Sequence, residues 1–394
     1  MPFFIQDIFY KAWELVLDTY IWWLPVLLVI IFWNLWIYYI RARYLYGVNW
    51  ILLEIKLPRE ITKTPKAMEV FINSLHITKD GNLIEKYWQG FLRPWFSLEI
   101  AGINGQVRFF IYTQKFFRNL IEAQLYAQYP DAEIVEMEDY SKAAFHLEEF
   151  GTKWGCFGTE FKLIAEDAYP IKTYIDYGLH EMGTKEEFKT DPITALLELL
   201  GSTKQGEQIW MQILIRATKK EWKDEAKKLI DKLMKRDQKL KEGETTASMG
   251  ALMLSPGERS VIEAIERDVS KLGFDVDIRM IYLANNESFN AVNIPAMIGT
   301  MKQYNSLNLN GFKPVRSTSV DYLLKKTRET RMKLTMLDAF RKRSCFYMPY
   351  VRSSFVLNSE ELATIYHFPG RVAETPTFGR IEAKKSEPPT NLPI

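Results

Sequence analysis

The pattern of hydrophobic and polar positions divides the chain into one long apolar stretch near its start and a body of shorter segments. Residues 21–40 read IWWLPVLLVIIFWNLWIYYI, twenty residues without a charge and with one side-chain amide, Asn34. A helix of this length spans roughly 30 Å at about 1.5 Å per residue, which matches the hydrocarbon core of a bilayer. The pattern therefore predicts a transmembrane helix, and a buried core helix is the alternative.

The ends of this stretch favour a membrane–water interface. Aromatic side chains gather at both ends, and Pro25 falls in the expected first turns, where a missing N–H costs least. Arg41 and Arg43 follow the span directly, whereas three acidic residues and one lysine precede it. The positive-inside rule then predicts a single-pass protein of the cytoplasmic (inner) membrane with its C-terminal region in the cytoplasm. The residues that mark the predicted span are Ile21, Trp22, Trp23, Pro25, Asn34, Tyr38, Tyr39 and Ile40.

The residues around the span form two short regions. Residues 1–19 repeat apolar side chains close to a helical period, at Phe4, Ile8, Trp13 and Val16 or Leu17. They form either an amphipathic lead-in helix along the outer interface or a frayed lead-in. Residues 20–46 then hold the transmembrane helix and its basic flank.

Residues 48–140 carry short alternating apolar segments separated by amphipathic stretches. The run WFSLEIAGINGQVRFFIYT places two alternating segments around Asn104-Gly105, the strongest short signal for a β-hairpin. A strand and a helix precede this hairpin, and an amphipathic helix and a closing strand follow it. The order β-α-β-β-α-β predicts a ferredoxin-like α+β domain.

Residues 150–370 again alternate helical and strand-like segments. The stretch EQIWMQILIRAT reads as a strand, and SPGERSVIEAIERDVSKLG as a helix that Ser255 caps ahead of Pro256. The element order predicts a second α+β domain and, by analogy with the first, a second ferredoxin-like unit. The fold class is thus α+β, a transmembrane helix followed by two ferredoxin-like (βαββαβ) units. Residues 371–394, rich in Pro, Lys and Glu, predict an extended or disordered linker.

The composition excludes several classes of site. The 394 residues carry a net charge of +2, and the two cysteines, Cys156 and Cys345, stand in unrelated settings. Net charge therefore names no partner, and neither a zinc knuckle nor a disulfide framework is indicated. No stretch matches G-x-x-x-x-G-K-[ST], H-E-x-x-H, G-x-S-x-G or G-x-G-x-x-G. We predict no catalytic, cofactor-binding or metal-binding residues and a protein that is not itself an enzyme.

A basic cluster is the strongest local charge feature. It comprises Lys325, Lys326, Arg328, Arg331, Arg341, Lys342 and Arg343. Positive charge on one side, near a membrane, can bind phosphates of DNA or of anionic lipid. A solvated surface or a contact between domains is the other interpretation of the cluster.

Three blocks of the body resemble the region upstream of the motor domain in conjugative-transfer ATPases of the FtsK/HerA-like class, the type IV secretion relatives. They are NSEELATIYHFP at 358–369, SPGERSVIEAIERDVSKLGFDVDIRMIYLA at 255–284, and DPITALLELLGSTKQGEQIWMQILIRAT at 191–218. The aromatic span followed by Arg-x-Arg resembles membrane-anchored versions of these proteins. The resemblance implies a non-catalytic region that anchors or regulates such an ATPase in DNA or protein transfer, with the ATPase either fused or separate. No catalytic residue is carried over, and a homo-oligomer is left open.

The last block suggests a docking edge. Asn358 or Ser359 caps a short helix, with Glu361 placed for a capping box. Leu362, Ile365 and Phe368 then form an apolar edge that either meets a partner ATPase or closes the chain's own second domain. His367 lies beside this edge, as a packed or capping histidine or as a ligand or switch.

A second function from another class is a membrane-tethered nucleic-acid-binding module. Ferredoxin-like sheets can stack bases on exposed aromatic side chains, and Phe109, Phe110 and Tyr112 lie on a predicted central strand. Strand alternation places Phe109 and Tyr112 on opposite faces of the sheet, and at least one of those faces must belong to the core. A membrane-bound hydrolase is a third hypothesis that no motif supports.

Overall fold

The computed structural model describes residues 2–58, 61, 63–143, 153–181, 190–219, 222–234, 254–320 and 325–370. The chain divides into two compact units. The first unit comprises Met1–Asn49 and Lys79–Arg93, and the second comprises Trp50–Thr78 and the described residues from Pro94 onward. The expected domains 48–140 and 150–370 thus share one compact unit, apart from the loop at Lys79–Arg93. The tail at 371–394 lies outside the described residues.

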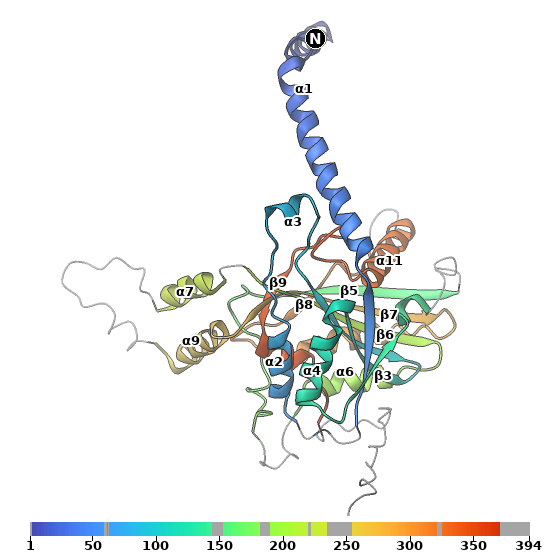
Figure 1. Ribbon diagram of the computed structural model, residues 1–394, viewed down its shortest axis with the longest axis vertical. Coiled ribbons are helices and arrows are strands. Elements are labelled where there is room, and N and C mark those ends of the chain that lie inside the picture. The colour runs from blue at the N-terminus through green and yellow to red at the C-terminus, as the bar shows by residue number, and fades with distance from the viewer. Residues whose placement is uncertain are drawn as a thin grey trace, which may run out of the picture. The chain divides into compact units, whose positions relative to one another are not determined.

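The first unit consists of a long helix, α1 (Pro2–Gly47), and a loop that carries the short helix α3 (Leu83–Tyr87) (Figure 1). The lead-in and the predicted span belong to one continuous helix. Its stretch Leu17–Gly47 has a mean hydropathy of 1.9 in its most apolar window, none of which is buried inside the protein. The helix is therefore long and apolar enough to cross a membrane.

Pro25 is placed differently from the expectation. Because α1 begins at Pro2, Pro25 stands in the helix interior and not in its first turns. Proline lacks the N–H that would bond the carbonyl four residues earlier, so one hydrogen bond of the helix is missing there. Asn34 is satisfied within the helix, since its Nδ2 donates to the Ile30 carbonyl oxygen at 2.8 Å.

The second unit is built on one antiparallel sheet, which has nine strands among the described residues. Eight strands form the path β4-β1-β3-β2-β6-β7-β5-β8, and β9 pairs with β7 beside it. The strands are β1 (Trp50–Lys56), β2 (Phe96–Ile103), β3 (Gln106–Gln114), β4 (Glu133–Met137), β5 (Trp154–Leu163), β6 (Glu207–Ala217), β7 (Gly273–Asn285), β8 (Phe312–Val315) and β9 (Phe355–Asn358).

The sequence predicted two ferredoxin-like units, and the structure has one continuous antiparallel sheet. Strands β2 and β6 pair from Phe96–Ile215 to Ile103–Gln208, so the hydrogen-bonded ladder continues across the expected boundary. Strand β2, which would be an edge strand in a unit of β1–β4 alone, is thereby paired with β6. This pairing removes an exposed row of unpaired backbone groups. The α+β class stands, with one continuous sheet.

Local turn and cap chemistry follows the sequence closely. The hairpin between β2 and β3 turns at Asn104 and Gly105, with φ of 52° and 81°, the left-handed geometry that Asn-Gly favours. The helix that begins at Pro256 has the predicted cap, because Ser255 and Glu258 form a reciprocal capping box. Both predictions are confirmed.

Helices cover both faces of the sheet. On one face α2, α4, α6, α10 and α12 pack into the main hydrophobic core, and on the other α11 packs through Met336, Leu337 and Phe340 onto a second cluster (Figure 1). Helices α7 and α9 form a third, smaller cluster. The helices of this unit are α2 (Pro65–Ser74), α4 (Arg118–Gln128), α5 (Tyr140–Ala143), α6 (Ile193–Gly201), α7 (Trp222–Leu233), α9 (Pro256–Val269), α10 (Asn293–Met301), α11 (Lys325–Arg341) and α12 (Ser359–Ile365), with short 3₁₀ turns η1 (Lys115–Phe117) and η4 (Lys302–Tyr304).

We predict that Gly102→Ala lowers the stability of the folded chain. A Cβ at Gly102 would lie 2.5 Å from the Leu200 carbonyl oxygen of α6, so the helix would have to move away from β2. Overpacking of this kind costs about 1–3 kcal/mol. The measurement is the unfolding midpoint of the full chain in detergent micelles, followed by tryptophan fluorescence.

The matched control is Gly299→Ala, inside α10. A Cβ there meets nothing within 4 Å, so the change should leave stability unchanged or raise it by about 0.5–1 kcal/mol through helix propensity. Equal midpoints for the two variants would contradict the close packing of α6 on β2.

Candidate functional site

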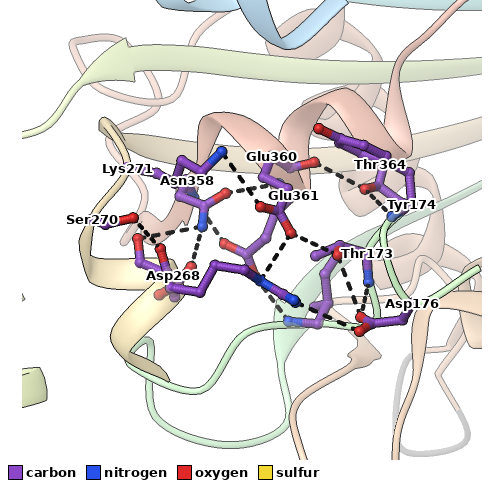
Figure 2. Close-up of polar contacts among 12 residues, drawn as sticks. Thr173, Tyr174, Asp176, Asp268, Ser270, Lys271, Asn358, Glu360, Glu361 and Thr364 are labelled. Atoms are coloured by element: carbon purple, nitrogen blue, oxygen red, sulfur yellow. Dashed lines mark hydrogen bonds and ion pairs between the residues drawn. The ribbon is translucent and has the colours of Figure 1, made fainter. Parts of the chain in front are cut away.

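A buried polar cluster surrounds α12, the helix that begins directly after β9. Figure 2 shows its side chains converging from α9, from α12 and from the segment after β5. We call it the α12 cluster and define it as Glu69, Thr173, Arg267, Asp268, Lys271, Asn358, Glu360 and Glu361. Its two glutamates on α12, with Asp268 and Asn358, are almost completely buried.

The start of α12 has the capping box that its sequence predicts. The Glu361 N–H donates to Asn358 Oδ1 at 2.8 Å, and the Asn358 N–H donates to Glu361 Oε2 at 2.8 Å. The two residues therefore satisfy each other's backbone donors at the first turn of the helix. This cap is buried, whereas the capping boxes at Asn82 and Ser255 are exposed.

Asp268 and Glu361 form a carboxyl pair inside this cluster. Burial raises the pKa of Asp268 well above its usual range, and its hydrogen bond to Glu361 adds to the effect. Burial likewise raises the pKa of Glu361 to about 8, with a further contribution from the charge of Glu360. Two adjacent buried carboxyls cannot both ionise at low cost, so the pair keeps at least one proton at neutral pH. Asn358 Nδ2 donates to Asp268 Oδ1 and fixes that carboxyl group.

Glu360 is paired with two cations at the edge of the cluster. Its Oε1 accepts a hydrogen bond from Thr173 Oγ1 at 2.7 Å and lies 3.4 Å from Arg267 Nε. Lys271 Nζ lies 3.5 Å from Glu360 Oε2 and 2.6 Å from Glu69 Oε1 of α2. Because the Arg267 and Lys271 side chains are about one-third exposed while Glu360 is buried, these cations separate the cluster from solvent.

The same helix also holds the segment that follows β5. The Ile171 N–H donates to Glu361 Oε1 at 2.9 Å, and the Tyr174 N–H donates to Thr364 Oγ1 at 2.9 Å. Tyr174 Oη in turn donates to Glu69 Oε2 at 2.6 Å. The α12 cluster therefore joins α2, α9, α12 and residues 171–176. Its hydrogen bonds and ion pairs hold these elements together, and we call it a structural joint for that reason.

A second buried contact fixes the chain just after α12. His367 Nε2 lies 3.0 Å from Asp191 Oδ2, and His367 Nδ1 lies 2.9 Å from the Ala363 carbonyl oxygen. Burial by itself would lower the pKa of His367, but the Asp191 carboxylate outweighs it and raises that pKa. Burial acts on Asp191 in the opposite sense, yet His367 lowers its pKa. The packed-histidine interpretation is therefore the one that the structure supports.

The proposed docking edge on α12 requires correction. Leu362, Ile365 and Phe368 are all buried in the main core, and His367 is buried with them. Phe368 packs edge-on against Phe109 at 5.3 Å between ring centroids. Of the two alternatives, the edge closes the chain's own fold, and its side chains are not accessible to a partner.

The basic cluster is split by the fold. Arg343 is completely buried, with its Nε 3.0 Å from Glu99 Oε1 and its Nη1 paired to Asp139, so it cannot contact a phosphate. Arg341 Nε donates to the Ser141 carbonyl oxygen at 2.9 Å, and Lys342 pairs with Asp338 at 2.7 Å. The remaining members Lys325, Lys326, Arg328 and Arg331 are exposed on the first turns of α11.

A shallow depression lies among these exposed residues. It is lined by Lys326, Thr327, Thr330, Arg331, Leu334 and Thr335. Its two cations, Lys326 and Arg331, lie on one helix face and are suited to a phosphate group. The Thr330 and Thr335 hydroxyls donate to the Lys326 and Arg331 carbonyl oxygens and therefore do not donate to a ligand. Lys326 and Arg331 are the cations that line the depression, so this interpretation depends on them.

Base stacking on the sheet is not available. Phe109 and Phe110 are buried on opposite faces, one in the main core and one in the second cluster. Tyr112 stacks on Trp50 with ring centroids 5.2 Å apart, and the Arg343 guanidinium lies 4.3 Å from its ring centroid. The covered sheet therefore corrects the idea that these aromatic side chains bind bases.

The predicted membrane residues all lie on α1. The span from Ile21 to Ile40 is helical throughout, and Arg41 and Arg43 lie in its last two turns, the first half-buried and the second exposed. Among the described residues no group of three or more His, Cys, Asp or Glu side chains is arranged to hold a metal ion.

Sequence reasoning missed Asp268, Arg267 and Lys271. One weak signal for Asp268 was present in the sequence. Asp268 continues the three-residue spacing of Ile262 and Ile265, so it falls on the buried face of the helix. The surface interpretation of a charged residue on a helix was the natural one, since most such residues are exposed.

We predict that stability falls as the pH rises from about 5 to about 8 and beyond. In the unfolded chain the Asp268 and Glu361 carboxyls have their ordinary pKa values of 3.8 and 4.5, whereas in the folded chain burial raises both pKa values and the pair holds its protons to higher pH. The folded state then binds more protons, and each such proton contributes a slope of up to ~1.4 kcal/mol per pH unit. The stabilisation that these two carboxyls contribute is fully present below their unfolded-state pKa values and is lost as the pH rises through their folded-state pKa values. The measurement is the unfolding midpoint as a function of pH.

Asp268→Asn provides the comparison, because its amide mimics the protonated acid and cannot ionise. It should flatten the pH dependence, leaving the part that comes from His367, whereas the surface control Glu198→Gln should leave the slope unchanged. An Asp268→Asn profile parallel to that of the unaltered chain would refute the shared proton.

The family to which the chain belongs follows from comparison with known proteins. No curated protein matches the chain. The model of a family described as "Domain of unknown function (DUF8128)" matches residues 47–380, which include the whole sheet and the α12 cluster. The chain belongs to the DUF8128 family.

Proposed function

We propose that this protein is a single-pass membrane protein whose cytoplasmic body, without catalytic activity of its own, anchors or regulates an FtsK/HerA-like ATPase of the type IV secretion or conjugation class. The ATPase is either fused to the chain or separate, and the process it serves is transfer of DNA or protein. The proposal has two parts: membrane anchoring by α1, the membrane part, and service to an ATPase, the motor part.

The membrane part is supported by the exposure of α1. Four apolar side chains along the span, Ile21, Val29, Phe32 and Leu35, have exposed fractions of 61–65%. A contiguous apolar surface of this length is unfavourable in water but matches the hydrocarbon of a bilayer. Arg41 and Arg43 at its C-terminal end favour a body on the cytoplasmic side.

The motor part is supported by the way the three blocks that resemble motor-associated proteins meet. Asn358 of the last block bonds to Asp268 of the second block, and His367 of the last block pairs with Asp191 of the third block. These contacts involve buried residues at the start of α12 and in the segment directly after it, and residues 371–394 follow in the sequence. A rigid attachment just before residue 371 would couple movements of a motor domain that follows or binds there to the body.

We also infer a repeated plan within the sheet. The sheet order read from its two edges is β4-β1-β3-β2 and β8-β5-β7-β6. With all neighbours antiparallel, each half has the strand order 4-1-3-2 of a ferredoxin-like arrangement. We infer two such halves fused through β2 and β6, the second with α7 and α9 between its second and third strands.

A membrane-tethered nucleic-acid-binding module is the second candidate function. One observation favours it, the exposed depression on α11 between Lys326 and Arg331. Contacts of this kind would reach the phosphate backbone and not the bases, so the binding would be independent of sequence.

We predict that the purified full chain in nanodiscs retains an FtsK/HerA-like ATPase from the same cell and turns over no ATP alone. Glu360→Gln should reduce that retention several-fold, because it weakens the contacts of Glu360 with Arg267 and Lys271 and so loosens the joint ahead of residue 371. The measurement is ATPase retained per mole of chain, together with ATP turnover.

Glu198→Gln, on the exposed face of α6, removes the same charge away from the joint and should retain the ATPase fully. Recovery of the protein from the soluble fraction would overturn the membrane part. Intrinsic ATP turnover by the chain would overturn the motor part, and no retention of any such ATPase would overturn the form of it in which the ATPase is separate.

We also predict weak, salt-dependent binding of single-stranded DNA if the second function holds. The double change Lys326→Ala and Arg331→Ala should remove two phosphate contacts and reduce the slope of log K against log salt by about 1.4. The measurement is fluorescence anisotropy of a labelled oligonucleotide between low and physiological salt.

The matched control is Lys204→Ala with Lys313→Ala, two exposed lysines elsewhere on the body. If both double variants lose the same affinity, binding depends on overall charge, and the depression on α11 is not a site.

A further inference from the structure

The loop Lys79–Arg93 presents apolar side chains beside the membrane-spanning helix. We call this segment the α3 loop. We propose that it is a second membrane contact, in which α3 inserts into the interfacial layer of the leaflet at the C-terminal end of the span. The inference rests on the proposed membrane anchoring by α1 and goes beyond it, since a single span requires no further lipid contact.

The tip of the α3 loop is apolar and uncovered. Helix α3 has no buried residue. Leu83, Ile84, Tyr87 and Trp88 have exposed fractions of 72%, 62%, 38% and 64%. A leucine and an isoleucine next to a tyrosine and a tryptophan is the composition that favours the headgroup–acyl boundary. On a protein in water the same four side chains would form an unfavourable patch.

The tip is fastened to the apolar part of α1. Trp36 Nε1 donates to the Tyr87 carbonyl oxygen at 2.9 Å. The Trp36 and Trp88 rings meet edge-on with centroids 5.5 Å apart, and the Trp33 and Tyr87 rings lie 5.8 Å apart. The exposed side chains of α3 thus continue the lipid-facing surface of the span, which identifies lipid as the occupant.

A second set of contacts lies nearer the C-terminal end of α1. Phe91 packs against Tyr44 with ring centroids 5.7 Å apart. Gly90 has φ of +72°, and a Cβ there would lie 2.3 Å from the Ile40 carbonyl oxygen. Only glycine therefore allows the loop to approach the backbone of α1 so closely.

The position of the contacts along α1 sets the depth of the tip. Trp36 and Trp33 lie four and seven residues before Ile40, the last residue of the predicted span. At 1.5 Å per residue the tip reaches roughly 6–10 Å inside that end of the span. This matches the depth of about 5–10 Å at which interfacial amphipathic helices lie.

The charged residues of the α3 loop are arranged to stay out of the hydrocarbon. Asn82 and Glu85 form a reciprocal capping box at the start of α3, with both hydrogen bonds at 2.7–2.8 Å. Lys86 and Arg93 both pair with Asp80 at the neck of the loop. The pairing holds the tip rigid and leaves the neck with a small excess of positive charge, which suits an anionic lipid surface.

The test is the lipid exposure of a nitroxide label at Leu83 in the full chain. Both native cysteines, Cys156 and Cys345, are buried, so Leu83→Cys directs the label to α3. The protein is placed in vesicles of phosphatidylethanolamine and phosphatidylglycerol. Power saturation then compares collisions with oxygen, which enters lipid, and with a water-soluble nickel chelate. We expect a shift toward oxygen at Leu83.

Two reference positions separate the possible failures. Leu28→Cys, in the middle of the span and 54% exposed, should report lipid, and Leu307→Cys, a fully exposed leucine of the body, should report water. If Leu28 also reports water, the membrane anchoring itself fails and the α3 contact with it. If Leu28 reports lipid while Leu83 matches Leu307, anchoring stands and the α3 proposal is overturned.

A label at Leu83 that neither reagent reaches would also overturn the proposal, because a second copy or another protein would then cover α3. Gly90→Ala supplies an independent check. Its Cβ cannot fit against Ile40, so it should move the Leu83 label toward water while Leu28 keeps its lipid signal. Gly299→Ala, where a Cβ meets nothing, should leave both labels unchanged.

Discussion

The pairing of β2 with β6 is the constraint on which the body of this protein depends. These strands come from segments more than a hundred residues apart, yet they form an eight-residue antiparallel ladder in the middle of the sheet. Joining them leaves a single sheet whose two faces must both be covered, and the helices of both halves do so. The consequence is that aromatic side chains such as Phe109 and Phe110 fill two cores and do not form a binding surface.

The covered sheet carries buried charge at several places, among them the Arg279–Asp277 pair and the two described next. On one face Arg343 lies between Glu99 and Asp139, and on the other Glu360 and Glu361 of α12 meet Asp268. Buried charges cost free energy unless they are paired or protonated, and here both solutions occur. Arg343 is paired, whereas Asp268 and Glu361 share protons. The α12 cluster thereby ties α12 to elements from three earlier parts of the chain.

The first unit follows a different physical rule, because its surface is apolar where the body's surface is polar. An exposed apolar helix and an exposed apolar loop beside it are both expensive in water, and one solvent, lipid, removes both costs. This common requirement is the reason to treat α1 and the α3 loop as one membrane-facing unit. Trp33 and Trp36 serve both elements, since each lies on the span and contacts Tyr87 or Trp88.

The sequence by itself determined the features that depend on neighbouring residues: the apolar span, the Asn104-Gly105 turn, and the capping boxes at Ser255 and Asn358. Each follows from local hydrogen bonding or from the length of an uncharged run. Only the tertiary structure decided that two expected units share one sheet, that Arg343 leaves the basic cluster, and that Leu362 and Phe368 face inward. Periodicity shows that a residue is apolar on one side of an element, but the partner of that side depends on strand pairings between distant segments. The α3 loop was missed for the same reason, because its five-residue helix gains meaning only from lying beside α1.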